Sequence, residues 1–193
     1  MKKIFVILGH PNKESFCGEL FDAYVRGAKT AGHEVRETRI GDLRFDPILH
    51  KGHKEIQPLE PDLKKAQEDI IWAEHVVFIF PTWWASFPAL LKGFIDRIFL
   101  PGFGFKYRKK NSLFRDKLLA GRSSRVIITM DAPVWYYYLV YGASGWIAFK
   151  NGILKFCGFK RVRGTLIGRL RFLSENKRKK WINRIEAMGK SGK

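Results

Sequence analysis

The sequence has few of the features that mark a secreted, membrane-spanning or metal-bound protein. Its 193 residues include only two cysteines, Cys17 and Cys157, which provide neither a disulfide framework nor a zinc site. No apolar run approaches the ~20 residues that a transmembrane helix requires. The first apolar run, from Ile4 to Leu8, is shorter than the roughly 7–15 residues of a signal-peptide core. These absences predict a cytoplasmic protein whose first apolar run is a buried strand.

Acidic residues are scarce as well. The chain has 18 Asp and Glu against 36 Lys and Arg, and its net charge is +18. Residues 160–193 hold 12 of the basic residues and two of the acidic ones. Such a surface attracts anions, and an acidic membrane or a phosphorylated cofactor is a candidate partner. A basic surface without a special partner remains the alternative. We predict no nucleic-acid partner, because the sequence carries none of the common nucleic-acid-binding motifs.

Apolar runs alternate with helical periodicities along the chain and predict an α/β fold. Continuous or alternating apolar patterns predict five strands, over residues 2–8, 33–40, 75–80, 123–130 and 160–168. Spacing and cap residues predict helices over residues 16–31, 61–74, 87–100, 145–159 and 174–189. The segments 41–60, 101–117 and 129–145 are expected to be irregular. This order predicts one domain, residues 1–193, with a parallel sheet covered by helices on both faces.

In such sheets ligands bind beyond the carboxyl ends of the strands. The loop "GHPNKESF" follows the first strand and leads into a helix N-terminus, where free N–H groups suit a phosphate. Ser15 can cap this helix, and His10 and Lys13 add donors and positive charge. The spacing matches neither a Walker A nor a dinucleotide-binding motif, so a purely structural role for His10 remains open.

The loop after the third strand contains two adjacent tryptophans. Pro81 ends the strand, and Trp83 and Trp84 follow where water should reach them. Backbone N–H and C=O groups beside indole rings suit a planar heteroaromatic ligand. Alternatively, both tryptophans seal the end of the core.

Four segments carry a resemblance to a known family: "GHPNKESF", "DLRFDPIL", "FPTWWASFPALLKGFIDRIFLPGFGFKY" and "GILKFCGF". In this order they resemble the flavodoxin-like NAD(P)H:quinone oxidoreductases. The resemblance implies a three-layer sandwich with a five-stranded parallel sheet in the order 2-1-3-4-5. It also implies a flavin, FMN or FAD, a homodimer, and ping-pong hydride transfer from NADPH or NADH to a quinone-like acceptor.

The resemblance also assigns residues. Those expected around the flavin phosphates are His10, Ser15, Phe16 and Cys17, with Cys17 standing where several relatives have Asn. Those expected along the isoalloxazine are Pro81, Thr82, Trp83, Trp84 and Ala85. Those expected at the flavin edge in the loop after the fourth strand are Thr129, Met130 and Asp131. Phe105 and Tyr107 match aromatic residues that cap the substrate pocket of the partner subunit.

The loop after the fourth strand departs from the family pattern. Many relatives have Thr-Thr-Gly-Gly there, whereas this chain has Thr-Met-Asp-Ala-Pro, from Thr129 to Pro133. All five histidines precede residue 76, so the pocket histidine of some relatives has no counterpart. We therefore expect water or a tyrosine such as Tyr136, Tyr137 or Tyr138 to supply the proton for the acceptor. Residues 135–138 can form an aromatic wall for a nicotinamide or quinone, and a hydrophobic dimer contact is an equally good and compatible interpretation.

Other candidate features predict less. His50 and His53 lack further ligands, so no metal site is expected. Asp96 and Arg97 are expected on an exposed helix face.

The basic residues Lys106, Arg108, Lys109 and Lys110 favour NADPH over NADH, because they could bind its 2′-phosphate. A rival hypothesis is a flavin-binding regulatory module whose basic C-terminal region docks on a membrane transport protein or an anionic membrane.

Overall fold

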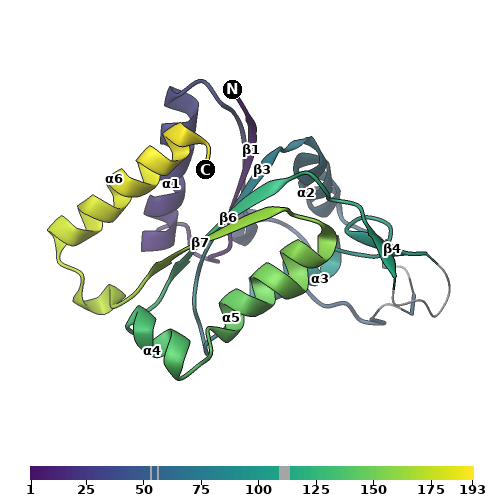
Figure 1. The fold of residues 1–193 in the computed structure, drawn as a ribbon. Coiled ribbons are helices and arrows are strands. Elements are labelled where there is room, and N and C mark those ends of the chain that lie inside the picture. Colours follow the sequence, from purple (N-terminus) through teal and green to yellow (C-terminus); the bar gives the residue numbers. More distant parts are fainter. Residues whose placement is uncertain (53, 56, 109–113) are drawn as a thin grey trace.

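A parallel sheet of five strands forms the centre of the molecule (Figure 1). The computed structural model describes residues 1–52, 54–55, 57–108 and 114–193. The strand order β2-β1-β3-β6-β7 is the predicted 2-1-3-4-5 order, since β4 and β5 form a separate hairpin. The strands are β1 (Lys3–Leu8), β2 (Glu34–Arg39), β3 (His75–Pro81), β4 (Phe105–Tyr107), β5 (Arg115–Lys117), β6 (Ser123–Thr129) and β7 (Arg161–Ile167).

Helices cover both faces of the sheet. In Figure 1, α1 (Phe16–Thr30) and α6 (Glu175–Ser191) lie on one face, and α2 (Pro61–Trp72), α3 (Ala89–Ile98) and α5 (Ser144–Ile147) lie on the other. The remaining helical segments are α4 (Val134–Leu139), the π-helical continuation of α5 (Ala148–Lys155), and two 3₁₀ turns (Ile40–Asp42 and Leu170–Phe172). Among the described residues, no helix combines the length and apolarity needed to cross a bilayer.

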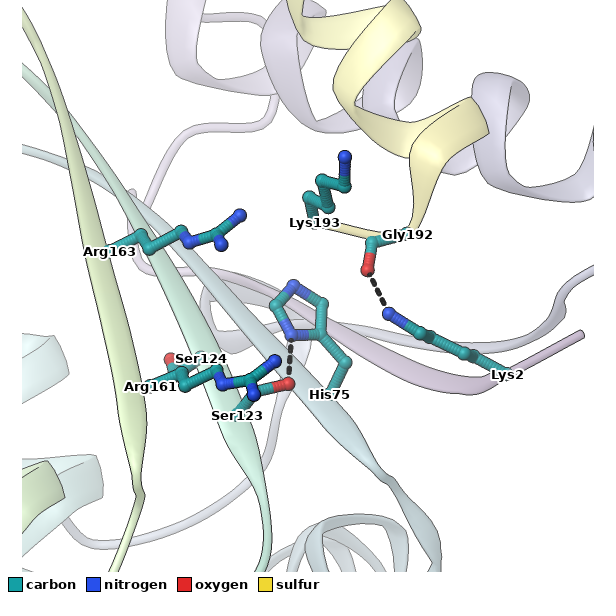
Figure 2. Close-up of a pocket in the computed structure, with 8 residues that line it drawn as sticks. All are labelled: Lys2, His75, Ser123, Ser124, Arg161, Arg163, Gly192 and Lys193. Carbon is teal, nitrogen blue, oxygen red and sulfur yellow. Dashed lines mark hydrogen bonds between the residues drawn. The ribbon is translucent and has the colours of Figure 1, made fainter.

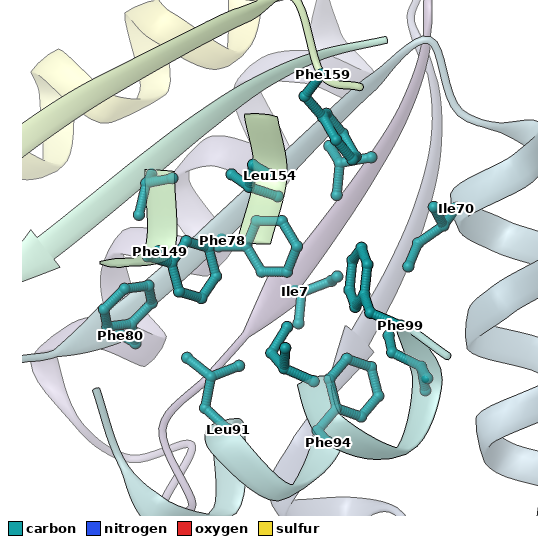
Figure 3. Close-up of a cluster of buried hydrophobic side chains, with 14 of the residues drawn as sticks. Ile7, Ile70, Phe78, Phe80, Leu91, Phe94, Phe99, Phe149, Leu154 and Phe159 are labelled. Atoms are coloured by element: carbon teal, nitrogen blue, oxygen red, sulfur yellow. The ribbon is translucent and has the colours of Figure 1, made fainter. Parts of the chain in front are cut away.

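The buried strands divide their side chains between two cores because successive strand residues point to opposite faces. In β1, Ile4, Val6 and Leu8 pack under α1 and α6. Phe5 and Ile7 belong to the core on the other face, which Figure 3 shows as a cluster of Phe, Ile and Leu side chains. A strand buried on both faces must be apolar throughout, which is why β1 and β3 appear in the sequence as unbroken apolar runs.

Glycines let α1 and α6 approach each other closely. A Cβ on Gly27 would lie 2.1 Å from the backbone oxygen of Glu186, and a Cβ on Gly189 would lie 2.2 Å from that of Tyr24. Both distances are too short for a real side chain, so the helix pair depends on glycine at these two positions. This packing places α6 along α1, with the chain end near the start of β1 (Figure 1).

Two segments expected to be irregular contain regular structure. Within residues 101–117, β4 and β5 pair as an antiparallel hairpin. Within residues 129–145, the tyrosine run forms the helix α4 instead of a loop. Pro133 precedes α4, and its extended backbone (ψ 142°) sets the start of this short helix.

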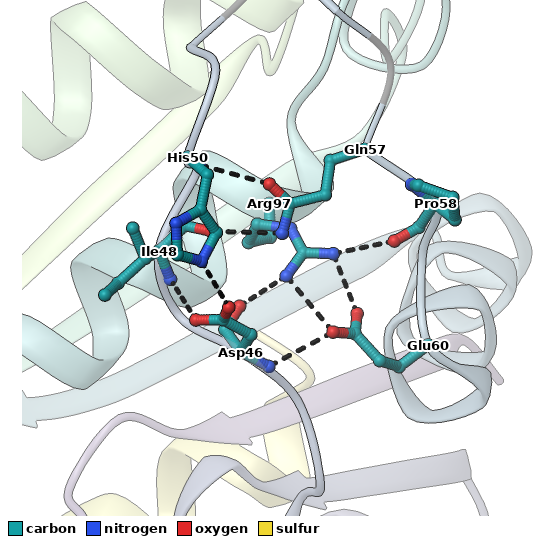
Figure 4. A network of polar contacts seen from close by, with 7 residues as sticks. All are labelled: Asp46, Ile48, His50, Gln57, Pro58, Glu60 and Arg97. Carbon is teal, nitrogen blue, oxygen red and sulfur yellow. Dashed lines mark hydrogen bonds and ion pairs between the residues drawn. The ribbon is translucent and has the colours of Figure 1, made fainter.

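The expectation for Arg97 was wrong, because its side chain is completely buried. Figure 4 shows its guanidinium between the segments that precede α2: Nη1 and Nη2 contact the Glu60 carboxylate, and they also donate to the carbonyl oxygens of Asp46 and Pro58. Asp46 in turn pairs with the exposed His50 at 2.6 Å. Asp96 lies closer to the surface and pairs with Lys92, also at 2.6 Å. Helical spacing could not separate the two residues, since Arg97 is buried by its contacts with Asp46, Pro58 and Glu60, which lie outside α3.

Candidate functional site

Three loops meet at the carboxyl ends of β1, β3 and β6, as the parallel sheet requires. The first is held to β3 by the N–H of Gly9, which donates to the oxygen of Ile79 at 2.7 Å. The second is held to β6 by the N–H of Thr82, which donates to the oxygen of Thr129 at 2.7 Å. The loops are therefore parts of one surface, built on the ends of the three central strands.

Internal hydrogen bonds shape the loop that follows β1. The N–H of Asn12 donates to Nδ1 of His10 at 2.9 Å, and the N–H of Glu14 donates to the side-chain oxygen of Asn12 at 2.8 Å. Because Nδ1 accepts, a neutral His10 ring carries its proton on Nε2, which leaves an N–H donor on the outer side of the ring. Burial lowers the pKa of His10 below its usual value, which favours this neutral form.

The expected cap of α1 by Ser15 is confirmed. Its hydroxyl accepts from the N–H of Gly18 at 3.3 Å and donates to the oxygen of Asn12 at 2.8 Å. Within the described part of the chain, the N–H groups of Phe16 and Cys17 have no protein acceptor. The loop lies so close to the helix that a Cβ on Gly18 would be 1.8 Å from the oxygen of Lys13. The helix end thus presents free donors at its positive pole.

The two tryptophans lie on a tight turn after β3. Trp83 and Ser86 exchange both backbone hydrogen bonds, at 2.8 and 2.9 Å. The two central residues have positive φ, 51° for Trp84 and 58° for Ala85, which is the geometry of a type I′ turn. That turn favours Asn and Gly, so a tryptophan and an alanine hold it under strain. Strain of this kind marks positions at which side-chain placement matters more than local stability.

The turn presents both an aromatic ring and unused donors. The Trp84 side chain is fully exposed, at 101%, whereas Trp83 is 44% exposed. Across the described residues, the N–H groups of Trp84 and Ala85 donate to no protein acceptor. The Trp83 ring stands edge-on to the His10 ring with 5.5 Å between centroids. The first two loops therefore form one surface with an aromatic plane, two backbone donors and a neutral imidazole.

The residues that support this turn were not identified from the sequence. The oxygen of Ala85 accepts from the N–H of Gly145 at 3.0 Å and from the hydroxyl of Ser144 at 3.1 Å. A Cβ on Gly145 would lie 2.7 Å from that oxygen, so only glycine permits this contact. The small Ser-Gly pair at the start of the helix predicted over residues 145–159 was the available signal, and such pairs are too common to indicate this contact.

Two of the three candidate side chains in the loop after β6 are buried. The Thr129 hydroxyl is buried 3.2 Å from the Cys17 thiol, and Met130 is 4% exposed in the core. Burial raises the pKa of Cys17 to about 12, so its thiol stays protonated. Asp131 is exposed and pairs with Arg171 at 2.9 Å. Of these side chains, only that of Asp131 lies at the surface, while Cys17 and Thr129 join the first and third loops from below.

The three candidate tyrosines lie on α4, and their surroundings differ. Tyr137 is 1% exposed, and its hydroxyl accepts from the N–H of Trp146 at 2.9 Å. Burial also raises the pKa of this phenol. Tyr137 therefore holds α4 against α5 below the Trp84–Ala85 turn. Tyr136 is partly exposed and Tyr138 is 48% exposed, so these two can meet a bound molecule.

Phe105 and Tyr107 do not lie near these loops in their own chain. Both are on β4, which Figure 1 places well apart from α4. The Phe105 ring packs edge-on against Phe156 at 4.9 Å and against Tyr107 at 5.4 Å, and Tyr107 is 51% exposed. The two rings border a shallow apolar cavity of about 490 Å³.

The described residues contain no group of three His, Cys, Asp or Glu side chains that could hold an ion. His50 is paired with Asp46, whereas His53 lies outside the described residues. Lys109 and Lys110 of the basic cluster also lie outside them.

Comparison with known proteins agrees with this geometry. A family model described as "Flavodoxin-like fold" matches residues 2–188. An uncharacterized NAD(P)H oxidoreductase of Haemophilus influenzae is 27% identical over 92% of this chain and 89% of its own length. The mouse ribosyldihydronicotinamide dehydrogenase [quinone] is also 27% identical, over 98% of this chain and 93% of its own. A crystal structure of Smu.1420 from Streptococcus mutans UA159 is 28% identical, covers 97% of this chain and 98% of its own, and superposes with a TM-score of 0.82.

Proposed function

We propose that this chain, which belongs to the flavodoxin-like fold family, is a flavin-dependent NAD(P)H dehydrogenase that reduces quinones or similar acceptors. The observation that carries the proposal is the strained turn that exposes Trp84 completely, together with the free N–H groups of Phe16 and Cys17 at the start of α1. The names of the relatives from Haemophilus influenzae and mouse support the reaction class.

The residues present fit a flavin. Its phosphate would lie at the N-terminus of α1, bound by the free N–H groups of Phe16 and Cys17 and by Nε2 of His10. The ring system would lie along Thr82–Ala85, with the N–H groups of Trp84 and Ala85 at its polar edge and the indole along its face. Ser15 would act as the helix cap and Cys17 through its backbone, because the hydroxyl and the thiol are already used inside the protein.

A bound flavin would supply ping-pong chemistry, taking hydride from a nicotinamide and passing it to the acceptor. The chain's own residues position both substrates and supply the proton. Tyr136 and Tyr138 are partly exposed on α4, on either side of the buried Tyr137, so we assign them the proton to the acceptor oxygen. Tyr137 is a positioning residue, because its side chain is 1% exposed and its hydroxyl accepts from the N–H of Trp146 inside the protein.

A second copy of the chain would complete the site. Exposed apolar side chains lie on α4, directly after it and at the end of α5: Trp135, Leu139, Val140 and Ile147. Large apolar side chains exposed together in this way suit a protein interface. We infer a homodimer in which this face is covered and Phe105 and Tyr107 reach the partner's flavin. The described residues Lys106 and Arg108, the latter paired with Asp116 at 2.8 Å, would then supply positive charge for the 2′-phosphate on the adenosine end of NADPH.

The regulatory hypothesis has one specific observation in its favour. On α6, Lys177, Lys180 and Arg184 surround Trp181 along a shallow groove. Basic residues beside a tryptophan suit an anionic membrane surface. Docking through α6 would be compatible with enzyme activity, since α6 lies on the opposite face of the sheet from α3 and α5 (Figure 1).

Steady-state kinetics with NADPH and benzoquinone would test the proposed reaction. We expect parallel lines in double-reciprocal plots for the wild type. Tyr136→Phe or Tyr138→Phe should lower kcat about tenfold, which is less than the ~10²–10⁴-fold of a dedicated general acid because water can replace the phenol. Tyr141→Phe is the control: it removes a hydroxyl but keeps the ring that packs edge-on against Tyr136 at 5.5 Å, and it should leave kcat unchanged. A flavin-loaded protein that oxidises neither NADPH nor NADH would contradict the proposal.

A further inference from the structure

A second polar cavity lies at the amino end of the sheet, at the opposite ends of the strands from the turn. It has a volume of about 130 Å³ and is bordered by the starts of β3, β6 and β7 and by both chain ends (Figure 2). His75 begins β3 and Pro81 ends it, so the two ends are roughly 20 Å apart at about 3.3 Å per strand residue. The proposed flavin chemistry does not involve this cavity.

His75 at the base of the cavity is buried, and only one of its two ring nitrogens has a hydrogen-bond partner among the described residues. Its side chain is 3% exposed, and its Nδ1 lies 2.8 Å from the hydroxyl of Ser123. Its Nε2 is buried without a hydrogen-bond partner in the described protein. Figure 2 shows the ring between Lys2 and Arg163, with Nε2 directed toward the space below Gly192. A buried polar nitrogen without a partner is costly, and it marks a place where a ligand atom is missing.

The walls of the cavity are positively charged. Lys2, Arg161 and Arg163 border it, and in the described part of the chain none of them forms an ion pair. Lys2 donates to the oxygen of Gly192 at 2.8 Å, and Arg125 lies behind the ring and donates to the hydroxyl of Thr165 at 2.8 Å. No Asp or Glu side chain is among the described residues that border the cavity, and the main-chain oxygen of Lys193 at its rim accepts from Nε of Arg125 at 2.5 Å. The nearby Glu74 is used elsewhere, accepting from the N–H of Lys3 at 2.9 Å.

The missing group should therefore be an anion with several acceptor oxygens. A water molecule occupies about 30 Å³ in the liquid, so the cavity has room for roughly four waters or one tetrahedral oxyanion. Two guanidinium groups, an ammonium and an imidazole exceed what one carboxylate can accept and neutralise. Arginine forks and lysine are also the usual partners of phosphate oxygens.

We propose that this cavity binds a phosphate group carrying two negative charges, free or as the monoester of a larger molecule. Arg161 and Arg163 donate to its oxygens from β7, Lys2 approaches from β1, and the Nε2–H of His75 donates from below. The Ser123 hydroxyl lies 2.8 Å from Nδ1 of His75 and 3.4 Å from the oxygen of Glu74. Donation along the shorter contact, to Nδ1, is the tautomer that the proposal requires, because it leaves the imidazole proton on Nε2.

Titration calorimetry with sodium phosphate, against sodium chloride at equal ionic strength, tests the site. We expect the wild type to bind phosphate, and Arg161→Gln/Arg163→Gln to bind at least about tenfold more weakly, since two charge-assisted hydrogen bonds are lost. The matched control Lys64→Gln/Lys155→Gln removes the same charge from exposed positions elsewhere and should change affinity less than twofold. No binding by the folded wild type, or equal weakening in the control, would overturn the proposal.

A pair of variants at His75 separates a donor from a merely structural ring. His75→Gln keeps an N–H donor at the same reach and should retain most of the affinity. His75→Leu removes it and should weaken binding about tenfold. Circular dichroism identifies any variant that does not fold. Equal affinity of folded His75→Leu and wild type would show that the ring does not contact the anion.

The source of the phosphate is resolved by a second arm with vesicles. Phosphatidylcholine vesicles that contain phosphatidic acid present a phosphomonoester, whereas phosphatidylglycerol presents a diester of lower charge. Binding to phosphatidic acid that requires Arg161 and Arg163 assigns a lipid headgroup. Binding of inorganic phosphate, with no binding to vesicles of either lipid, assigns a soluble ligand.

Discussion

Two regions of the molecule differ in whether their polar groups have hydrogen-bond partners. They are the surroundings of Arg97 and the turn from Trp83 to Ser86. Both terminal nitrogens of the buried Arg97 find protein acceptors, the Glu60 carboxylate and two carbonyl oxygens, and only its Nε lacks one. In the turn, the N–H groups of Trp84 and Ala85 find none among the described residues, although φ is strained at both positions. The first region is organised for stability and the second for a ligand.

The difference shows how structural and binding groups can be told apart in this molecule. The buried Arg97 guanidinium holds Asp46, Pro58 and Glu60 against α3. Both of its terminal nitrogens have protein acceptors, so neither is available to a ligand. Donors without protein partners, beside an exposed aromatic ring or inside a charged cavity, indicate a place where a ligand supplies the acceptors. By this criterion His75 belongs with the turn and not with Arg97, although both His75 and Arg97 are buried.

Removing the Arg97 guanidinium should give the largest stability effect. Arg97→Met leaves two carbonyl oxygens and the Glu60 carboxylate without their donor, and Glu60 is 29% exposed and can be partly hydrated. We expect a loss of about 3 kcal/mol, the lower end of the range for breaking a buried pair. Urea unfolding measures it. The control Lys92→Met breaks the exposed Lys92–Asp96 pair on the same helix and should cost under about 1 kcal/mol.

The expected effect at His75 is a change in the pH dependence of stability. Burial, reinforced by Lys2, Arg125, Arg163 and His33, lowers the pKa of His75 from 6.5 to about 3. Between these values the unfolded chain binds a proton that the folded chain does not, so stability falls as the pH drops from 6.5 toward 3. Other charged groups near the ring are Arg161, Lys193 and Glu74, and each stays in the variant.

His75→Gln should remove this dependence. In phosphate-free buffer, the wild type should lose about 2 kcal/mol more than the variant between pH 7 and pH 5, at 1.36 kcal/mol per pKa unit. For a chain of this size that corresponds to a difference in Tm of roughly 4–8 °C. Added phosphate should reduce the loss of stability of the wild type between pH 7 and pH 5, and it should not change the pH dependence of the variant in this way. Identical pH profiles would mean that the His75 ring already has a partner and resembles Arg97 after all.

Replacing the strained turn should have the smallest effect on stability and the opposite sign. Trp84→Asn/Ala85→Gly installs the residues that a type I′ turn prefers. We expect a gain of about 1 kcal/mol in the protein without flavin, since positive φ costs about that much for other residues. The same variant should bind flavin more weakly because the indole is gone. Trp135→Asn on α4 is the control, since Trp135 is also exposed, at 63%, but has an ordinary helical backbone. A destabilised Asn-Gly variant would show that the turn is not strained.

The sequence predicted the fold well because its signals were local. The continuous apolar runs of β1, β3 and β6 and the helical spacing in α1 each specify one element, and parallel pairing follows from their alternation. The Ser15 cap and the exposure of Trp84 also followed from local chemistry. The four quoted segments identified the family, which the match over residues 2–188 confirms.

What the sequence could not show depends on contacts between distant segments. Arg97 has the spacing of a surface residue, and only the irregular chain around Asp46 and Pro58 buries it. In the sequence Tyr137 is indistinguishable from Tyr136 and Tyr138, and only the folded α4 brings its hydroxyl to the N–H of Trp146. The cavity at His75 joins the starts of three strands with both chain ends, and no motif spans those positions.

Flavin uptake tests the central claim most directly. Fluorescence titration of FMN and of FAD with the wild type should show saturable binding of at least one of them. His10→Ala/Ser15→Ala should weaken it about tenfold by removing one donor and the helix cap. His75→Gln, at the far end of the sheet, should leave it unchanged. Failure to bind either flavin, or unchanged affinity in the folded His10→Ala/Ser15→Ala variant, would contradict the account.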